Sequence, residues 1–547
     1  MLGALLAAAL AMNGSASANA GTTQLVIAPA AVARFVDNFN PFDTAQAFSW
    51  TGVDSLFYEP LVLYDGAQAD EYYPWLATSW AYSPSGQTVT FELRSGVHFA
   101  DGSVLTAADA AYSFNLVKQV PALAPGLEVV SASAVGPLSL SLTLGGPAYT
   151  EMQALATVPI VKAGYGGADP LRYVDRSPDG TGPYALARGG FSPQRLVLAA
   201  RHGYWQRGEP AVQRLVFPAF RDPAQLRAAL TSGGLDWAGT FMPDVRQAYA
   251  AREPAHHHYW LVPVATVALD LNLASGATSE LAVRNAISDD LDRQAISTAV
   301  SGGYDPPATS APGLVMPADA GLVGPGAGTR LSTHAQRAAA GQAMTAGGFH
   351  IGAAGYWVGA NGRHLALRLV APSGTVQASV GEVVARELSA AGFAVSYRAL
   401  GPAAWQEALS SGAFDAAVVR GQNGPDPYPM YRQWLDPALL VGGRAAQGDY
   451  GRLSRATLPA AATVVSRGLA AYASSPPGSP AAVAAARSIA SVVDRDRLVV
   501  PVVYASAWGE FSTAHAIGWP SGADPYEPAT PEPPFLEYTL LQLSPAN

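Results

Sequence analysis

Helices and strands alternate between residues 375 and 419, and this order constrains the fold more than any other feature of the sequence. An amphipathic helix over 375–391 is followed by a strand over 393–399, a helix over 402–411 and a strand over 414–419. Strands that are separated by helices pair in parallel, and the helices then cover the sheet. The sequence therefore predicts an α/β protein whose sheets are flanked by helices.

The rest of the chain extends this pattern. Apolar and polar residues alternate over 87–94, which predicts a half-buried strand. Thr106, with Asp109 three residues later, predicts the capped start of a helix over 106–120. We further expect strands over 24–28 and 235–238, helices over 222–233 and 459–492 with a break at 474–480, and a loop over 37–50.

Composition bounds the number of domains and the classes of partner. The chain has 547 residues, 49% hydrophobic and 13% charged. At roughly 100–200 residues per domain, this length predicts about three domains with large cores. Because 41 acidic residues outnumber 32 basic ones, giving a net charge of -9, the chain builds no phosphate-neutralising surface. We expect no nucleic-acid partner.

Several kinds of site are excluded by residues that the sequence lacks. Lys occurs only at Lys118 and Lys162, so Ser-x-x-Lys and Gly-Lys-Ser/Thr sites are absent. The sequence has no Cys, which excludes disulfides, thiolate nucleophiles and a lipidated Cys anchor. The consecutive residues 256–258 are His, but the His-x3-His spacing of zinc sites is absent, so a solvated loop is favoured there. We expect no metal site and no cofactor.

The N-terminus resembles a secretory signal. An uncharged apolar run over 2–12 is followed by Ala18-Asn19-Ala20, a small-x-small cleavage pattern, although no basic residue precedes the run. We expect residues 1–20 to be a signal peptide and the protein to act in the periplasm or at the extracellular face of the membrane. The alternative is a buried N-terminal helix.

A set of ordered motifs resembles a known family. The blocks Trp80–Gly86, Val89–Phe99 and Leu105–Asp109 closely resemble the signature of the bacterial extracellular solute-binding proteins of family 5, the oligopeptide- and dipeptide-type components of ABC importers. Further blocks that resemble the family, in its order, are Thr181–Tyr184, Tyr204-Trp205, Ala229–Asp236, Leu271-Asn272, Val283–Ile287, Asp292-Arg293, Gly412–Asp415 and Asp426-Pro427.

The resemblance implies a two-lobed clamp with an additional inserted domain, which closes on a solute and delivers it to a membrane permease. It places a discontinuous large lobe at 21–55, 186–271 and 506–547, the inserted domain at 56–185 and the second lobe at 272–505. We expect a monomer whose partners are the solute and the permease subunits of an ABC transporter.

Two solute classes make different demands on such a site. A peptide needs a buried carboxylate for its ammonium group and usually a cation for its carboxylate. An oligosaccharide needs aromatic platforms and neutral hydrogen-bonding groups. The 11 Trp and 23 Tyr favour an oligosaccharide. In peptide-binding relatives an Asp stands three residues before the Asp-Pro dipeptide, where this chain has Asn423, and the surrounding segment resembles the β-oligosaccharide-binding branch. A peptide or another small solute remains the alternative.

The candidate ligand-binding residues divide by chemistry. The aromatic candidates are Trp50, Trp237, Phe241, Tyr428, Tyr431, Trp434 and Trp508, and the hydrogen-bonding candidates are Asn40, Glu59, Gln422 and Asn423. Each has a structural alternative. Core packing competes with binding for Trp237 and for the helical pair Tyr431 and Trp434, and loop capping competes for the polar residues.

Two other classes of function are open. A secreted glycosidase would also use aromatic platforms, together with two carboxylates about 5–10 Å apart that the sequence cannot pair. The chain has neither a Gly-x-Ser-x-Gly elbow nor a His-Glu-x-x-His helix, so we expect no catalytic residues and no enzyme activity. A purely structural or adhesive surface protein would show no ligand-dependent closure.

Overall fold

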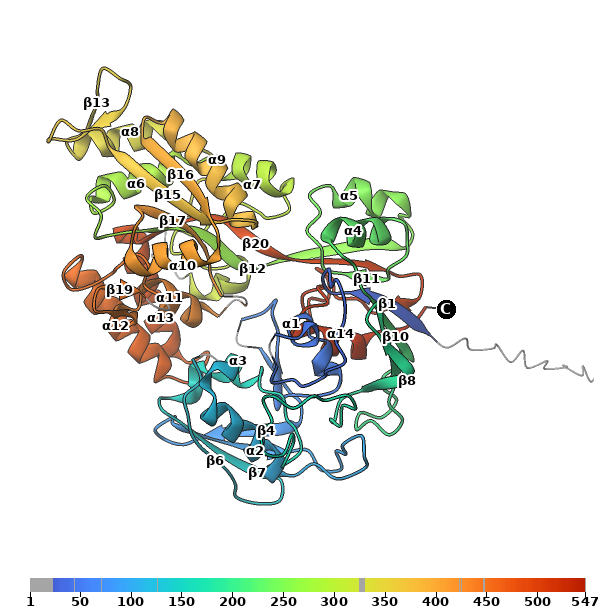
Figure 1. Cartoon of the computed structure of the whole chain (residues 1–547). Helices are drawn as coiled ribbons and strands as arrows, with labels where there is room; N and C mark the ends of the chain where they lie inside the picture. Colours follow the sequence, from blue (N-terminus) through green and yellow to red (C-terminus); the bar gives the residue numbers. More distant parts are fainter. Residues whose placement is uncertain are drawn as a thin grey trace, which may run out of the picture.

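The structure is a computed structural model that describes residues 23–43, 45–69, 71–124, 126–323, 330–422, 424, 426–445 and 448–546, with the backbone alone at 49 and 50. The predicted signal segment 1–20 and Asn423 lie outside these residues. Figure 1 shows α/β structure gathered on either side of two long strands, and the predicted α/β class with helix-flanked sheets is confirmed.

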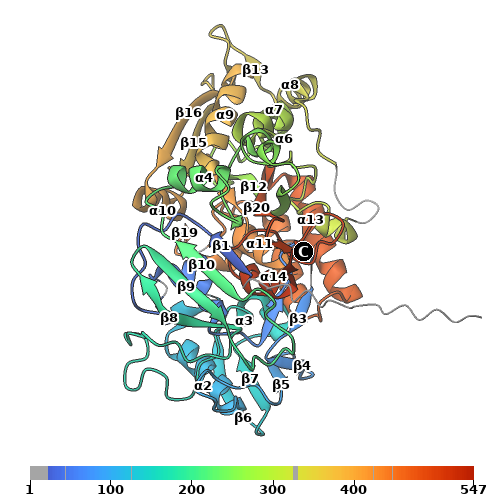
Figure 2. The same cartoon turned by 90° about the vertical axis from the view of Figure 1, so that its right-hand side faces the viewer.

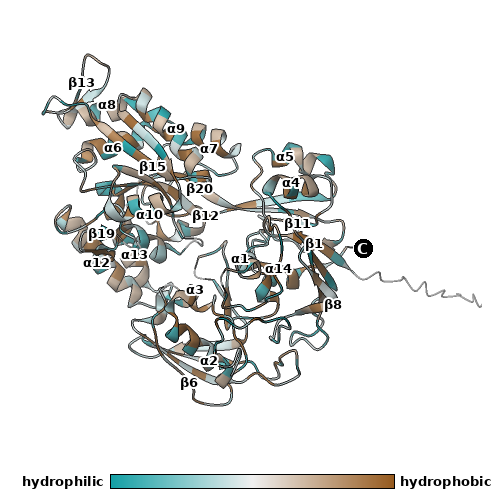
Figure 3. Ribbon diagram, viewed as in Figure 1, coloured by the Kyte–Doolittle hydropathy of each residue, from teal (hydrophilic) through white to brown (hydrophobic). Residues whose placement is uncertain are grey.

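One sheet runs through the described chain and gives the molecule its frame. Its ten strands follow the order β16-β15-β17-β12-β20-β11-β1-β10-β9-β8. At its centre, β12 (His257–Leu271) and β20 (Val499–Ser512) pair antiparallel. Strand β20 is hydrophobic over much of its length (Figure 3), as a strand with structure on both faces requires.

One end of this sheet carries the predicted parallel run. Strands β15 (Ala366–Pro372) and β16 (Ala394–Leu400) pair in parallel, and β17 (Ala416–Arg420) pairs in parallel with β15. Helices α9 (Val376–Ala390) and α10 (Pro402–Ser411) connect them, so the predicted alternation is confirmed. The other helices on this side are α6 (Leu281–Asp290), α7 (Arg293–Ser301), α8 (Arg337–Ala346), α11 (Pro427–Leu435), α12 (Pro459–Ala473) and α13 (Pro480–Asp496).

The other end of the sheet is built from N-terminal strands. Strand β1 (Gln24–Ala28), which coincides with the prediction, pairs in parallel with β10 (Arg214–Pro218) and β11 (Trp237–Ala238). Strands β8 (Tyr184–Ser192) and β9 (Arg195–Ala200) complete this edge (Figure 2). Helices α1 (Ala47–Thr51), α4 (Pro223–Thr231), α5 (Val245–Ala248) and α14 (Phe535–Gln542) lie on this side. The prediction of a loop throughout 37–50 was wrong at α1.

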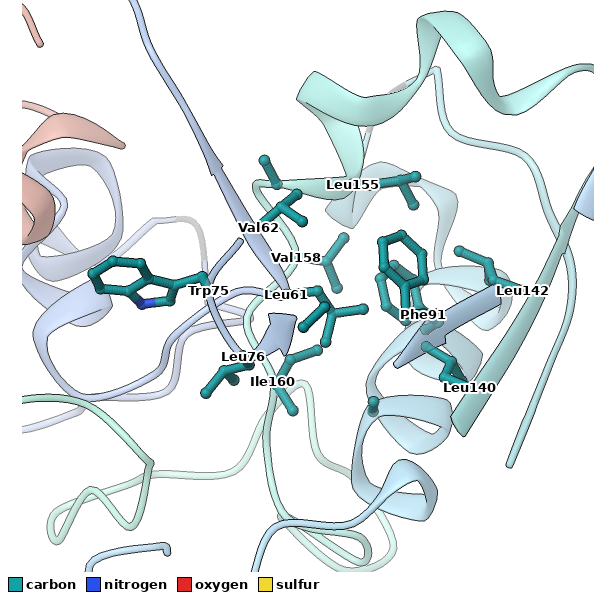
Figure 4. Packing of buried hydrophobic residues seen from close by; sticks show 14 of the residues in the cluster. Leu61, Val62, Trp75, Leu76, Phe91, Leu140, Leu142, Leu155, Val158 and Ile160 are labelled. Atoms are coloured by element: carbon teal, nitrogen blue, oxygen red, sulfur yellow. The ribbon is translucent and has the colours of Figure 1, made fainter. Parts of the chain in front are cut away.

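A separate antiparallel sheet lies within the predicted inserted domain. Its strands are β4 (Ala77–Tyr82), β5 (Thr88–Leu93), β7 (Ser139–Leu144) and β6 (Val129–Ala134), in that order. Helix α2 (Ala107–Gln119) covers it, and its predicted capping box is confirmed because Asp109 accepts from the backbone N–H of Thr106 at 2.8 Å. Figure 4 shows the core beneath, where Phe91, Leu140 and Leu142 meet Leu155 and Val158.

Short elements complete the described chain. They are β2 (Val62–Tyr64), β3 (Tyr72–Pro74), α3 (Met152–Leu155), β13 (His350–Ile351), β14 (Trp357–Val358), β18 (Leu440–Val441), β19 (Arg444–Ala445), β21 (Ala516–Ile517) and β22 (Ser544–Pro545). In the part of the chain that the structure describes, no helix has the length and apolar character that a membrane span needs.

Candidate functional site

Two strands alone connect the two ends of the large sheet over a short stretch. Strand β17 pairs with β12 from Val267 onwards, and β11 pairs with β20 only at Glu510 and Phe511. Between these regions, residues 260–266 of β12 pair with 504–509 of β20, and among the described residues no third strand pairs with them. We call this stretch the connecting ribbon. Its register shifts after Pro263, and such an irregularity breaks the ladder locally and favours bending.

A loop from the α9 side of the molecule lies along this ribbon. The backbone N–H of Gly421 donates to the carbonyl of Thr266 at 2.9 Å, and that of Gly424 donates to Val264 at 2.9 Å. Asp426 then caps α11 by accepting from the backbone N–H of Tyr428 at 2.9 Å. These bonds place Gln422 beside the ribbon, and its binding role stays a prediction. Asn423 lies in the same loop but outside the described residues.

The loop meets the segment that carries β2 and α3 across a narrow seam. A Cβ atom at Gly424 would lie 3.3 Å from Gln153 Nε2 on α3 and 3.8 Å from the ring of Tyr64 on β2. A small polar crevice here is lined by residues of both sides, namely Tyr64, Asp65, Gln68, Glu71, Tyr72, Gln153, Gly424 and Asp426. Burial raises the pKa of Tyr64 to about 12, and its hydrogen bond with Gln153 opposes the change. The seam joins segments that are far apart in sequence.

A larger cavity opens beside this seam. Its volume is about 320 Å³, and its lining comes from residues 41–64, 117–159 and 533–534. Tyr64 lines both the crevice and the cavity. The cavity is mostly apolar and has Asp54 as its only charged residue among the described lining. We call it the side chamber.

Two predicted binding residues meet at the ribbon. The rings of Phe241, just after β11, and Trp508, on β20, lie 5.0 Å apart. Trp508 also lies 5.9 Å from the ring of Tyr304, which follows α7. Trp508 is 9% exposed. We call these three rings the aromatic row; they lie beside the ribbon in one hydrophobic cluster with Leu226 and Leu230 of α4.

Charged groups accompany this aromatic row. Arg420 ends β17, and burial lowers the pKa of its guanidinium while the carboxylates of Glu532 and Asp305 oppose that change. Glu510 on β20 is fully buried and accepts from the backbone N–H of Thr240 at 3.1 Å. Burial raises the pKa of Glu510 to about 8. A cation and several acidic side chains therefore lie close to the ribbon.

Three predicted aromatic platforms are enclosed by protein. Trp237 is 0% exposed, its Nε1 donates to the carbonyl of Ala529 at 2.6 Å, and its ring packs against Trp519 at 5.2 Å. Tyr431 and Trp434 lie on one face of α11, as expected, and both are buried in the core beside β17. A ligand reaches these rings only if the packing opens, and their binding role stays a prediction.

The other predicted residues are dispersed. Asn40 is buried, and its amide donates to the carbonyls of Pro170 and Tyr173 at 2.8 and 2.9 Å. Glu59 is buried and accepts from Trp75, Tyr204 and Trp205 at 2.9, 2.6 and 3.0 Å. Tyr428 is half-buried and stacks on Tyr472 at 5.5 Å. Trp50 lies in α1, and its side chain falls outside the described part.

Sequence reasoning missed Tyr64, Gln153, Tyr304 and Arg420. Arg420 had a usable signal, because it directly follows a predicted strand and ligands gather at strand ends in α/β sheets. The other three had none, since only the fold brings them to the ribbon and the seam. Within the described ranges, no group of three His, Asp or Glu side chains could hold a metal ion.

Comparison with known proteins gives a consistent set of relatives. The family model "Bacterial extracellular solute-binding proteins, family 5 Middle" matches residues 71–438. The nickel-binding periplasmic protein of Escherichia coli K12 is 32% identical over 255 residues, 44% of this chain and 47% of that protein. Protein XP55 of Streptomyces lividans is 32% identical over 231 residues, 41% of each chain. The chain thus spans about half the length of the curated relatives it matches.

Solved structures share the fold along nearly the whole chain. The periplasmic oligopeptide-binding protein of Thermotoga maritima has a TM-score of 0.80 at 21% identity, covering 96% of this chain and 99% of that one. The mannohexaose-bound form has a TM-score of 0.73 at 20% identity, with the same coverage. NikA of Brucella suis in complex with Fe(III)-EDTA has a TM-score of 0.75 at 23% identity, covering 95% of this chain and 99% of that one.

Proposed function

The chain belongs to the bacterial extracellular solute-binding proteins of family 5, and on that premise we propose that it is the substrate-binding component of an ABC importer. The observation that carries the proposal is the connecting ribbon, where two strands alone join the described ends of the large sheet. Two rigid bodies on such a connection can close around a solute by bending at few residues. The closed form is then what the permease recognises.

The proposed lobes follow the boundaries expected from the sequence. The large lobe comprises 21–55, 186–271 and 506–547, with the inserted domain at 56–185 and the second lobe at 272–505. The aromatic row would face the solute from one side, and the seam would face it from the other. A solute shifts the open–closed equilibrium only by its preference for the closed form, and a shift from 1:99 to 99:1 needs about 5.5 kcal/mol.

We propose an uncharged oligosaccharide as the solute. The aromatic row at the ribbon suits sugar C–H faces. The neutral Asn423 provides no carboxylate where peptide-binding relatives have Asp. The mannohexaose-bound Thermotoga protein shows that a related fold can hold such a chain.

A peptide is the second candidate, and one observation favours it. The carboxylate of Glu532 attracts the guanidinium of Arg420, so these two groups could offer one partner to each charged end of a peptide. The Brucella relatives are named putative ABC transporter peptide-binding proteins at 28% identity. The nickel-binding relative points to a third class of solute.

A thermal-shift screen separates these solutes. A ligand at 100 times its Kd stabilises the folded state by about 2.7 kcal/mol, which raises the melting temperature measurably. We expect stabilisation by a cello-, xylo- or manno-oligosaccharide and no product after prolonged incubation. If only peptides stabilise the protein, the solute is a peptide and the oligosaccharide proposal is wrong. If a sugar is turned over, the protein is an enzyme and the transport proposal is wrong.

A further inference from the structure

The side chamber lies between two hydrophobic cores. Val117 and Val158 belong to the core of the inserted domain, whereas Phe42 and Tyr58 belong to the core under β1 and β10. Protein interiors normally leave few voids larger than a water molecule. A cavity of about 320 Å³ at this junction has the size of a small-molecule site.

The hydroxyl groups in the chamber are already used within the protein. Ser55 Oγ donates to the carbonyl of Gly52 at 2.8 Å, and Thr157 Oγ1 donates to that of Ala154 at 2.8 Å. The hydroxyl of Tyr58 donates to Asp175. The rest of the described lining is largely Pro, Leu, Val, Ala and Phe side chains. Such a surface offers dispersion contacts to a guest and few hydrogen bonds.

The charge of the lining further limits the chemical groups that the side chamber can bind. Asp54 is the only charged residue among the described lining, so a carboxylate or phosphate in the chamber would meet repulsion without a cation. Apolar groups of aromatic or branched aliphatic type fit both the lining and the volume. An engineered cavity of about 150 Å³ holds benzene in another protein, so roughly twice that volume accommodates a larger apolar group.

The position of Tyr64 connects this chamber to the proposed solute site. Its ring lines the chamber and also the crevice that Gly424 and Asp426 of the proposed second lobe complete. No described residue of 272–505 lines the chamber itself. A solute could therefore place one apolar group in the chamber while its polar part lies in the seam between the lobes.

We propose that the side chamber is a specificity subsite that receives an uncharged apolar group of the captured solute. This inference rests on the proposed function. The group could be the aglycone of a glycoside or an apolar side chain of a peptide, since both present the same chemistry. The chamber selects solutes that carry such a group over those that lack it.

The test uses the full chain and the neutral fluorophore N-phenyl-1-naphthylamine. We expect its fluorescence to rise on binding and saturate at one probe per chain. Thr157 lines the chamber and is exposed, so Thr157→Trp fills the cavity from its mouth with little effect on the core. This variant should weaken probe binding at least tenfold. Thr78→Trp, at an exposed position of β4, is the matched control and should bind as the wild type does.

Competition then identifies the source of the apolar group. One arm compares 4-nitrophenyl β-cellobioside with cellobiose, and the other compares Phe-Gly-Gly with Gly-Gly-Gly. In one of the two arms, we expect the compound that carries the ring to displace the probe. In that arm, the compound without the ring should bind at least tenfold more weakly. If Thr157→Trp melts early, Ser55→Trp tests the same cavity from another wall.

The two proposals fail in different ways. If the probe binds wild type and Thr157→Trp equally, or does not bind at all, the subsite proposal is wrong, and the proposed closure of the lobes on a solute is unaffected. If solutes with and without the ring bind equally, the subsite is again wrong. If the probe binds in the chamber but no sugar or peptide stabilises the chain, the proposed solute classes are wrong and the apolar chamber stands.

Discussion

The rings of Phe241 and Trp508 lie 5.0 Å apart at the connecting ribbon, and the ring of Tyr304 lies 5.9 Å from the same indole. The three side chains come from β20, from the segment after β11 and from the segment after α7. Trp508 therefore holds β20 of the ribbon against the segment after β11 and the segment after α7. A change at this position acts on the connection between the two bodies as well as on local packing.

Replacing Trp508 with Ala should lower the free energy of unfolding by about 3 kcal/mol, because the change removes a buried indole between two other rings. Chemical denaturation monitored by circular dichroism measures the loss. Trp405→Ala, at a half-buried position of α10, is the matched control and should cost less. Equal losses of unfolding free energy in the two variants would show that the aromatic row adds no stability at the ribbon.

The buried carboxyl of Glu510 should make stability depend on pH. Its pKa is raised from 4.5 to about 8 by burial, so the folded state holds a proton that the unfolded state has already released between these values. The contribution of Glu510 to the free energy of unfolding is complete below about pH 4.5 and is lost as the pH rises through 8. Glu510→Gln should flatten the decline in melting temperature between pH 5 and pH 8. An unchanged slope would contradict the raised pKa.

Trp237 provides a test of core packing against ligand binding. The structure encloses its ring and satisfies its Nε1, so Trp237→Phe should lose one hydrogen bond, about 1 kcal/mol of stability, with solute affinity unchanged. Denaturant titration and calorimetric ligand titration measure the two quantities separately. A loss of affinity without a loss of stability would instead make this ring a sugar platform.

Arg420 distinguishes a neutral solute from a peptide. Arg420→Gln removes the cation at the end of β17, and it should change the Kd for an oligosaccharide by less than about threefold. A peptide whose carboxylate pairs with this guanidinium would lose at least tenfold, since breaking a buried charged pair costs about 2 kcal/mol or more. Arg398→Gln, on an exposed position of β16, controls for net charge. A large loss of sugar affinity at Arg420 alone would contradict an uncharged guest.

Much of the fold could be predicted because local chemistry decides it. Asp222 accepts from the backbone N–H groups of Ala224 and Gln225, which starts α4 where the Asp-Pro pair predicts it. Helix α10 has the predicted bounds because Pro402 and Gly412 limit it. The antiparallel pairing of β12 with β20 could not be predicted, since their partners are distant in sequence and no local turn joins them.

The candidate site was less predictable for a physical reason. An aromatic residue next to a strand serves equally well as a core residue or as a platform, and only packing decides. Thus Phe241 and Trp508 meet at the ribbon, while Trp237 and Trp434 are enclosed. The polar candidates Asn40 and Glu59 hold buried hydrogen bonds that neither residue's sequence neighbours reveal.

Closure of the two lobes on a solute is tested most directly by a distance between them. Because the sequence has no Cys, Thr78→Cys and Ser396→Cys give two unique sites for spin labels, on exposed positions of β4 and β16. A second pair, Thr345→Cys and Ser396→Cys, lies within the proposed second lobe, and the distance between its labels should not change. Double electron–electron resonance should show that the distance between the labels at positions 78 and 396 shortens when the stabilising oligosaccharide is added at saturation. An unchanged distance at saturation would contradict a clamp that closes on its solute.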